Sequence, residues 1–270
     1  MVPYILRYFL QLVGYTLGAI VMCGLAVWVC QTLFIRLLGG QGSRIVIATA
    51  IIGTPVHELG HALMCILFGH RITAIRLWQP RSPDGTLGYV SHTYNPSNVF
   101  QQLGNIFIAC GPIFSGLIVL GLCLHYAFPA ALAAYTGTVT SMLDTSTTAL
   151  ELLAAGVQIV PNMAEEFLSD SFPVWARVIL VIVMLSVSLH INLSPADMRN
   201  ALRGVPMYLG VALLIAVITS YASMPLTYSI IWYLKMLNAY MMAMFTIILV
   251  FALLQVLIAL VIWLIKRIGR

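Results

Sequence analysis

Two histidines and a glutamate within the segment GTPVHELGHALM, Gly53–Met64, have the residue types and the spacing of a zinc-hydrolase site. His57 and His61 are four residues apart, so on a helix they share one face, about 6 Å apart along the axis, and can bind one ion. Glu58 follows the first histidine and can act as general base toward a water molecule on the metal. A chain of this composition is expected to contain an accidental HExxH match only about 0.002 times, so the motif predicts one zinc per chain.

The motif lies inside an apolar run, Ile45–Gly69, that is long enough to cross a bilayer. The chain is 61% hydrophobic and 8% charged, with a mean hydropathy of +1.00, whereas soluble proteins are about 25% charged. This composition predicts an integral membrane protein in contact with lipid, and its net charge of +5 indicates membrane topology rather than nucleic-acid binding. Placing an acid such as Glu58 in a membrane-spanning helix costs free energy. This favours a functional role for the motif over a polar triplet that only holds helices together.

Six apolar runs predict an all-α polytopic membrane protein with a single domain, residues 1–270. The predicted spans are Tyr8–Ile35, Ile45–Gly69, Gln101–Phe128, Pro173–Leu193, Val205–Tyr221 and Met236–Ile265. Between the third and fourth spans lies a predicted outer loop, Pro129–Phe172, in which Ser146–Val160 is expected to form a short interfacial helix.

The distribution of lysine and arginine predicts how the chain is oriented in the membrane. Both termini and the basic loops are expected in the cytoplasm, because that side then carries nine cations against four. The nine are Arg7, Arg71, Arg76, Arg81, Arg199, Arg203, Lys266, Arg267 and Arg270, and the four are Arg36, Arg44, Arg177 and Lys235. The small size and the lack of a targeting peptide favour the bacterial inner (cytoplasmic) membrane as the location.

The segment after the histidine motif, Arg71–Tyr94, is predicted to form a membrane-associated β-hairpin. Its centre, Ser82–Gly85, reads Ser-Pro-Asp-Gly, which is a strong turn signal. The flanks Ile72–Trp78 and Thr86–Tyr94 are rich in β-branched and aromatic residues, as strands are. The alternative interpretation is an ordinary basic surface loop.

A catalytic zinc site usually has three protein ligands, so a third ligand must come from elsewhere in the chain. Cys65 lies on the same predicted helix about 12 Å along the axis from His57, too far for bonds of about 2.0–2.3 Å. Asp197 lies at the end of the fourth apolar run and is the predicted third ligand. His190 is the competing ligand, although a lone histidine at a helix end is more often packed or hydrogen bonded.

Asp197 has a second interpretation that requires no metal. Ser194 can act as the N-cap of a helix, Pro195 as its first residue and Asp197 as a capping-box acid. The two interpretations are compatible, because the start of a helix can present a carboxylate to an ion.

Three segments together resemble the site-2 protease family of intramembrane zinc metalloproteases. The first is HELGH in a spanning helix, and the second is ACGPIFSG, Ala109–Gly116, which is similar to the Gly-Pro segment of that family. The third is NLSPAD, Asn192–Asp197, which resembles an Asn-x-x-Pro segment that leads to a liganding aspartate. Ser115 stands where an asparagine is common, and Met198 replaces the usual glycine after the aspartate, which also lies closer to the proline than usual.

The resemblance implies a zinc-dependent intramembrane endopeptidase with a β-hairpin after the zinc helix. The family often carries a PDZ domain, but no segment of this sequence is expected to hold one, which would make it a minimal member. His57, His61 and Asp197 would bind zinc, and Glu58 would activate the zinc-bound water. Asn192 would help to hold the oxyanion or the substrate backbone, although a helix-end hydrogen bond explains it equally well. The substrate would be a membrane-anchored protein or peptide.

Two other functions remain open at this stage. A prenyl-protein-type zinc protease also carries HExxH near a membrane, but its third ligand is usually a downstream glutamate. The glutamates downstream in this chain, Glu151, Glu165 and Glu166, belong to the predicted outer loop. The alternative outside enzymology is a zinc-binding membrane scaffold or transporter that binds the metal without hydrolysis.

Overall fold

The computed structural model describes residues 2–80, 82, 85–142, 149–169, 172–221 and 224–268, and this part of the chain is almost entirely helical. Long apolar helices confirm the prediction of an all-α polytopic membrane protein. In the described residues, four helices are long and apolar enough to cross a membrane, and a bent pair of helices is a fifth candidate. The candidates are Tyr4–Leu38, Gly40–Leu67, Pro195–Tyr221, Ser229–Ile268 and the pair Val99–Ala109 with Gly111–Ala127. The structure thus has four or five candidate spans in the described residues, compared with the six predicted from hydropathy.

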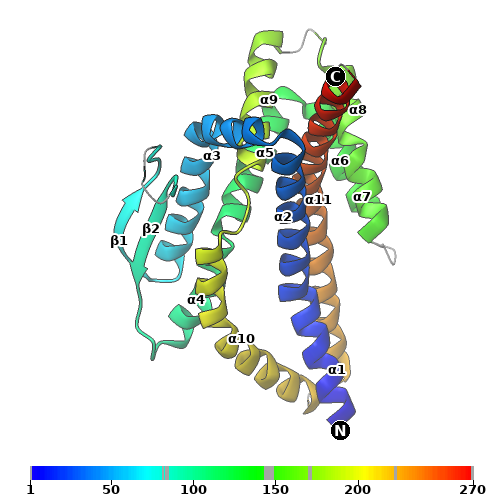
Figure 1. Cartoon of the computed structure of the whole chain (residues 1–270). Helices are drawn as coiled ribbons and strands as arrows, with labels where there is room; N and C mark the ends of the chain where they lie inside the picture. The colour runs from blue at the N-terminus through cyan, green and yellow to red at the C-terminus, as the bar shows by residue number, and fades with distance from the viewer. Residues whose placement is uncertain are drawn as a thin grey trace.

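The first candidate span is built from three consecutive helical segments. These are α1 (Val2–Val13), a π-helical turn η1 (Gly14–Gly18) and α2 (Ala19–Leu38). The last helix, α11 (Met224–Ile268), lies alongside this span over most of its length, as Figure 1 shows.

Two hydrogen bonds show that the first span and α11 run in the same direction. Asn238 Nδ2 donates to the Tyr15 carbonyl at 2.7 Å, and Lys266 Nζ donates to Gln41 Oε1, three residues beyond the end of α2. The N and C termini therefore lie at opposite ends of this helix pair (Figure 1). The cytoplasmic location predicted for both termini stays a prediction.

The hairpin predicted after the histidine motif is confirmed. Helix α3 (Gly40–Leu67) is followed by strands β1 (Arg71–Arg76) and β2 (Tyr89–Thr93), which pair antiparallel. Figure 1 shows the two strands on the outer side of α3, away from α2 and α11. In the predicted turn, the Gly85 N–H donates to the Ser82 carbonyl at 3.1 Å, and Gly85 has a φ of +76°, which glycine adopts without strain. Residues 83 and 84 of that turn lie outside the described residues.

The third predicted span is two helices rather than one. Helix α4 (Val99–Ala109) and helix α5 (Gly111–Ala127) meet at an angle of 53°. Pro112 lies in the first turn of α5 and has no N–H with which to continue the hydrogen bonding of α4. The proline therefore accounts for the break within an apolar run that hydropathy alone does not divide.

The remaining helices correct the predicted outer loop and the later spans. They are α6 (Pro129–Met142), α7 (Ala149–Val157), α8 (Ile159–Glu166), α9 (Val174–Ser188) and α10 (Pro195–Tyr221). The described part of the predicted loop is thus helical, because it is rich in alanine and leucine, and α7 overlaps the predicted interfacial helix. Helix α9 has 15 residues, fewer than the about 20 that cross a bilayer. Helices α10 and α11 begin at residues 195 and 224, well before the starts predicted at residues 205 and 236.

Helices α3 and α5 approach each other through a pair of glycines beside the histidine motif. A Cβ atom on Gly60 would overlap the backbone of Gly111 and the hydroxyl of Ser115. That hydroxyl donates a hydrogen bond to the Val56 carbonyl at 2.8 Å. The absence of side chains at the two glycines therefore lets the helix with the motif pack directly on the start of α5.

We predict that Gly60→Ala destabilises the protein by about 1–3 kcal/mol, because an added methyl group overpacks a contact between backbones. Gly121→Ala on α5 is the matched control, since a Cβ there meets nothing within 4 Å. The control should be neutral or slightly stabilising, by up to about 1 kcal/mol, because alanine favours the helix. Thermal unfolding in detergent measures both variants, and equal melting temperatures would contradict the close packing.

Candidate metal centre

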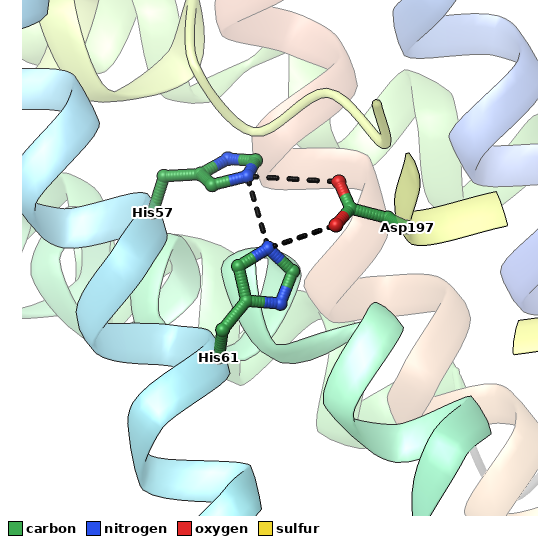
Figure 2. Close-up of side chains that lie close together, drawn as sticks. All are labelled: His57, His61 and Asp197. Atoms are coloured by element: carbon green, nitrogen blue, oxygen red, sulfur yellow. Dashed lines mark hydrogen bonds and ion pairs between the residues drawn. The ribbon is translucent and has the colours of Figure 1, made fainter. Parts of the chain in front are cut away.

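Figure 2 shows the side chains of His57, His61 and Asp197 converging on one point. The two histidines come from one face of α3, and their Nε2 atoms are 3.1 Å apart. The Asp197 carboxylate comes from the first turn of α10, with Oδ1 at 3.1 Å from His61 Nε2 and Oδ2 at 3.7 Å from His57 Nε2. The structure thus brings together the three residues predicted as metal ligands.

The spacing of these donor atoms fits a tetrahedral metal ion. Bonds of about 2.0–2.1 Å from zinc to nitrogen or oxygen place neighbouring ligand atoms about 3.3 Å apart. The three donor atoms here all lie within 4.8 Å of one another, and two of the three separations are 3.1 Å. Two imidazoles and one carboxylate are a donor set that catalytic zinc sites use, and they leave a fourth position free.

Each histidine is oriented by a backbone carbonyl on its other ring nitrogen. His57 Nδ1 donates to the His190 carbonyl at 2.7 Å, and His61 Nδ1 donates to the Ile108 carbonyl at 2.7 Å. Because each Nδ1 carries a proton, each Nε2 has a free lone pair directed at the common point. In an α-helix the Ile108 carbonyl would accept the N–H of residue 112, but Pro112 has none, so this carbonyl is available to His61.

His190 supports the site through its backbone rather than as the competing ligand. Its ring Nδ1 donates to the Ser186 carbonyl at 2.8 Å, while its own carbonyl accepts from His57. The ring packs against α3 at Gly53, where a Cβ atom would overlap it. Cys65 is completely buried and does not belong to the metal-binding group in the described chain, as its distance along the helix predicts.

The capping interpretation of Asp197 is confirmed, and the same carboxylate lies beside the two histidines. The Ser194 N–H donates to Asp197 Oδ2 at 2.7 Å, and the Asp197 N–H donates to Ser194 Oγ at 3.2 Å. These two reciprocal bonds form a capping box at the start of α10. The capping box fixes the carboxylate, so that Oδ1 faces His61 in a defined orientation.

Glu58 and Asn192 line the same cavity as the three ligands, with a volume of about 780 Å³. Glu58 is 6% exposed, and its Cγ lies against Gly88 of the hairpin segment, where a Cβ atom would come within 2.9 Å. The Asn192 amide donates to Gln31 Oε1, and Gln31 Nε2 in turn donates to the Leu189 carbonyl. In the described part of the chain, the buried Asn192 Oδ1 has no hydrogen-bond partner.

A second pair of histidines, not identified from the sequence, links the hairpin to the bundle. His70 Nε2 donates to the Gln101 carbonyl at 2.7 Å, so its Nδ1 must accept from His92 Nδ1, which lies at 3.0 Å. His92 Nε2 then accepts from Asn200 Nδ2 at 3.4 Å. This chain of bonds, the histidine relay, joins the end of α3, strand β2, helix α4 and the start of α10. It requires both imidazoles to be neutral.

The surroundings of the histidine relay favour the neutral rings. Burial lowers the pKa of His92 to about 4, and the positive charge of Arg203 acts in the same direction. Burial also lowers the pKa of His70, although its bond to the Gln101 carbonyl opposes this effect.

Searches of the chain against known protein families, curated proteins and solved structures found no match. The interpretation of the site therefore depends on its own geometry and on the resemblance of short motifs.

We predict that the protein loses stability as the pH falls from about 6.5 to about 4. Over this range the unfolded chain takes up a proton that the folded protein excludes from His92, whose pKa is about 4 when folded and 6.5 ordinarily. In His92→Gln the loss should be smaller. Melting temperatures in detergent across this pH range measure the effect.

The control is His125→Gln, which removes an exposed histidine of α5 and should leave the pH dependence unchanged. An identical pH dependence in wild type and His92→Gln would contradict the neutral relay.

Proposed function

We propose that the protein is a zinc-dependent intramembrane endopeptidase similar to the site-2 protease family. One observation carries the proposal: nitrogens of the two α3 histidines and the Asp197 carboxylate of α10 converge at 3.1–3.7 Å, and Glu58 follows His57 on α3, a helix apolar enough to span a membrane. Ionisable side chains at such a depth are costly unless they line a water-filled cavity, and this cavity of about 780 Å³ supplies the space. A metal centre within the membrane suits a substrate that is itself anchored in the membrane, because the scissile bond then lies at the same depth.

Zinc bound to His57, His61 and Asp197 would polarise the scissile carbonyl and make a water molecule more acidic. The Glu58 carboxylate takes a proton from the attacking water and delivers it to the leaving amine nitrogen. Asn192, whose amide is oriented by Gln31, would offer its second N–H to the substrate backbone.

The hairpin supports a role in holding an extended substrate. The continuous segment from Gly85 to His92 lines the cavity, and β2 is paired with β1 along only one of its two edges in the described structure. A substrate strand would add to the other edge through backbone hydrogen bonds. The close approach of Gly88 to Glu58 places this segment beside the proposed general base.

The proposed location is a bacterial inner membrane. Long apolar helices support an integral membrane protein. The proposed substrate is a protein or peptide anchored in the same bilayer, because a soluble substrate does not require a metal site between membrane-spanning helices.

We predict that Glu58→Gln lowers peptide-bond hydrolysis by about 10²–10⁴-fold, the usual contribution of a general base, while the bound zinc is retained. The assay follows the cleavage of fluorogenic membrane-spanning peptides in proteoliposomes. Glu165→Gln, an exposed position on α8, is the matched control and should keep full activity. A Glu58→Gln protein with wild-type turnover would contradict the mechanism and favour a metal-binding scaffold.

A further inference from the structure

The charges that line the catalytic cavity are unevenly distributed. The two acids, Glu58 and Asp197, belong to the metal centre, while the two cations, Arg199 and Arg203, lie beyond it. Both arginines are exposed, and in the described part of the chain neither has an ion pair or a hydrogen bond. The cavity therefore contains positive charge that the protein itself does not neutralise.

The position of these arginines on α10 relates them directly to the metal centre. Arg199 and Arg203 are four residues apart and share one face of the helix. They follow Asp197 by two and six residues, or about 3 and 9 Å along the axis. Asn200, between them, is anchored to His92 of the hairpin, so this part of α10 is one wall of the cavity.

We propose that Arg199 and Arg203 form an anion subsite that binds a carboxylate of the substrate close to its scissile bond. An extended peptide advances about 3.3 Å per residue, so the subsite fits an aspartate or glutamate about one to three residues from the cleaved bond. The guanidinium groups recognise a carboxylate through charge-assisted hydrogen bonds, and the positive potential of the two arginines attracts it into the cavity. The proposal rests on the proposed function, because it assigns the cavity to a peptide.

The cavity favours a peptide carboxylate over a lipid phosphate as the ligand. Arginines that bind lipid headgroups need only an outer surface at the membrane boundary. Arg199 and Arg203 instead line the same cavity as His57, Glu58 and the hairpin segment. A ligand that binds the arginines within this cavity therefore lies in the same cavity as the metal centre.

The test measures binding without turnover, in full-length Glu58→Gln protein reconstituted in phosphatidylcholine nanodiscs. The probes are three fluorescent membrane-spanning peptides that differ only in a Glu, Gln or Lys placed near the centre of an otherwise neutral flank. The Glu peptide should bind about tenfold more tightly than the Gln peptide, the effect of one charge-assisted hydrogen bond. Arg203→Gln should abolish this difference, and Arg203→Glu should make the Lys peptide the tighter ligand.

The control variant is Arg36→Gln, which removes an exposed arginine of α2 that does not line the cavity and should keep the preference for Glu. Retained zinc and an unchanged melting temperature confirm that each variant is folded.

Equal binding of the three peptides, or a preference that survives Arg203→Glu, would overturn the subsite. An Arg203-dependent gain in affinity for phosphatidylglycerol nanodiscs without a peptide preference would overturn it in favour of lipid binding. These outcomes do not depend on hydrolysis, so they are distinct from failure of the proposed protease activity.

Discussion

The hydrogen bonds that hold the two motif histidines determine the rest of the site. The N–H of an imidazole between apolar helices needs an acceptor, and each histidine gives its Nδ1 proton to a backbone carbonyl. A backbone carbonyl inside a helix is normally occupied, so the fold has to provide free ones. It does so at Ile108, which Pro112 leaves without a helical partner, and at His190, where the chain has left α9.

The same requirement explains why the surrounding helices are interrupted. The bend between α4 and α5 and the irregular segment between α9 and α10 both occur beside the histidine motif. Non-helical backbone at membrane depth is tolerated where protein or a water-filled cavity surrounds it. The glycines of the motif helix, Gly53 and Gly60, allow these interrupted segments to approach closely enough for the carbonyls to reach the rings.

The three residues of the candidate metal centre and the hairpin were predictable from the sequence, whereas their supporting contacts were not. The spacing of His57 and His61 specifies a shared helix face, and Asp197 is an unusual acid at the end of an apolar run. The carbonyls that orient the histidines have no residue-type signal, because every residue carries one. Hydropathy gave the correct fold class, but it does not separate a crossing helix from a bent or shorter one. The third predicted run divides into α4 and α5, and α9 is shorter than a helix that crosses a bilayer.

Metal analysis of the purified protein tests the central claim most directly. Elemental analysis with X-ray absorption on detergent-purified, chelator-free protein should find one zinc per chain, bound by light nitrogen and oxygen atoms at about 2.0–2.2 Å. His61→Ala and Asp197→Ala should each lose most of the metal, and Cys65→Ala should retain it. A wild-type protein without zinc, or a zinc bound by sulfur and retained in both ligand variants, would contradict the account.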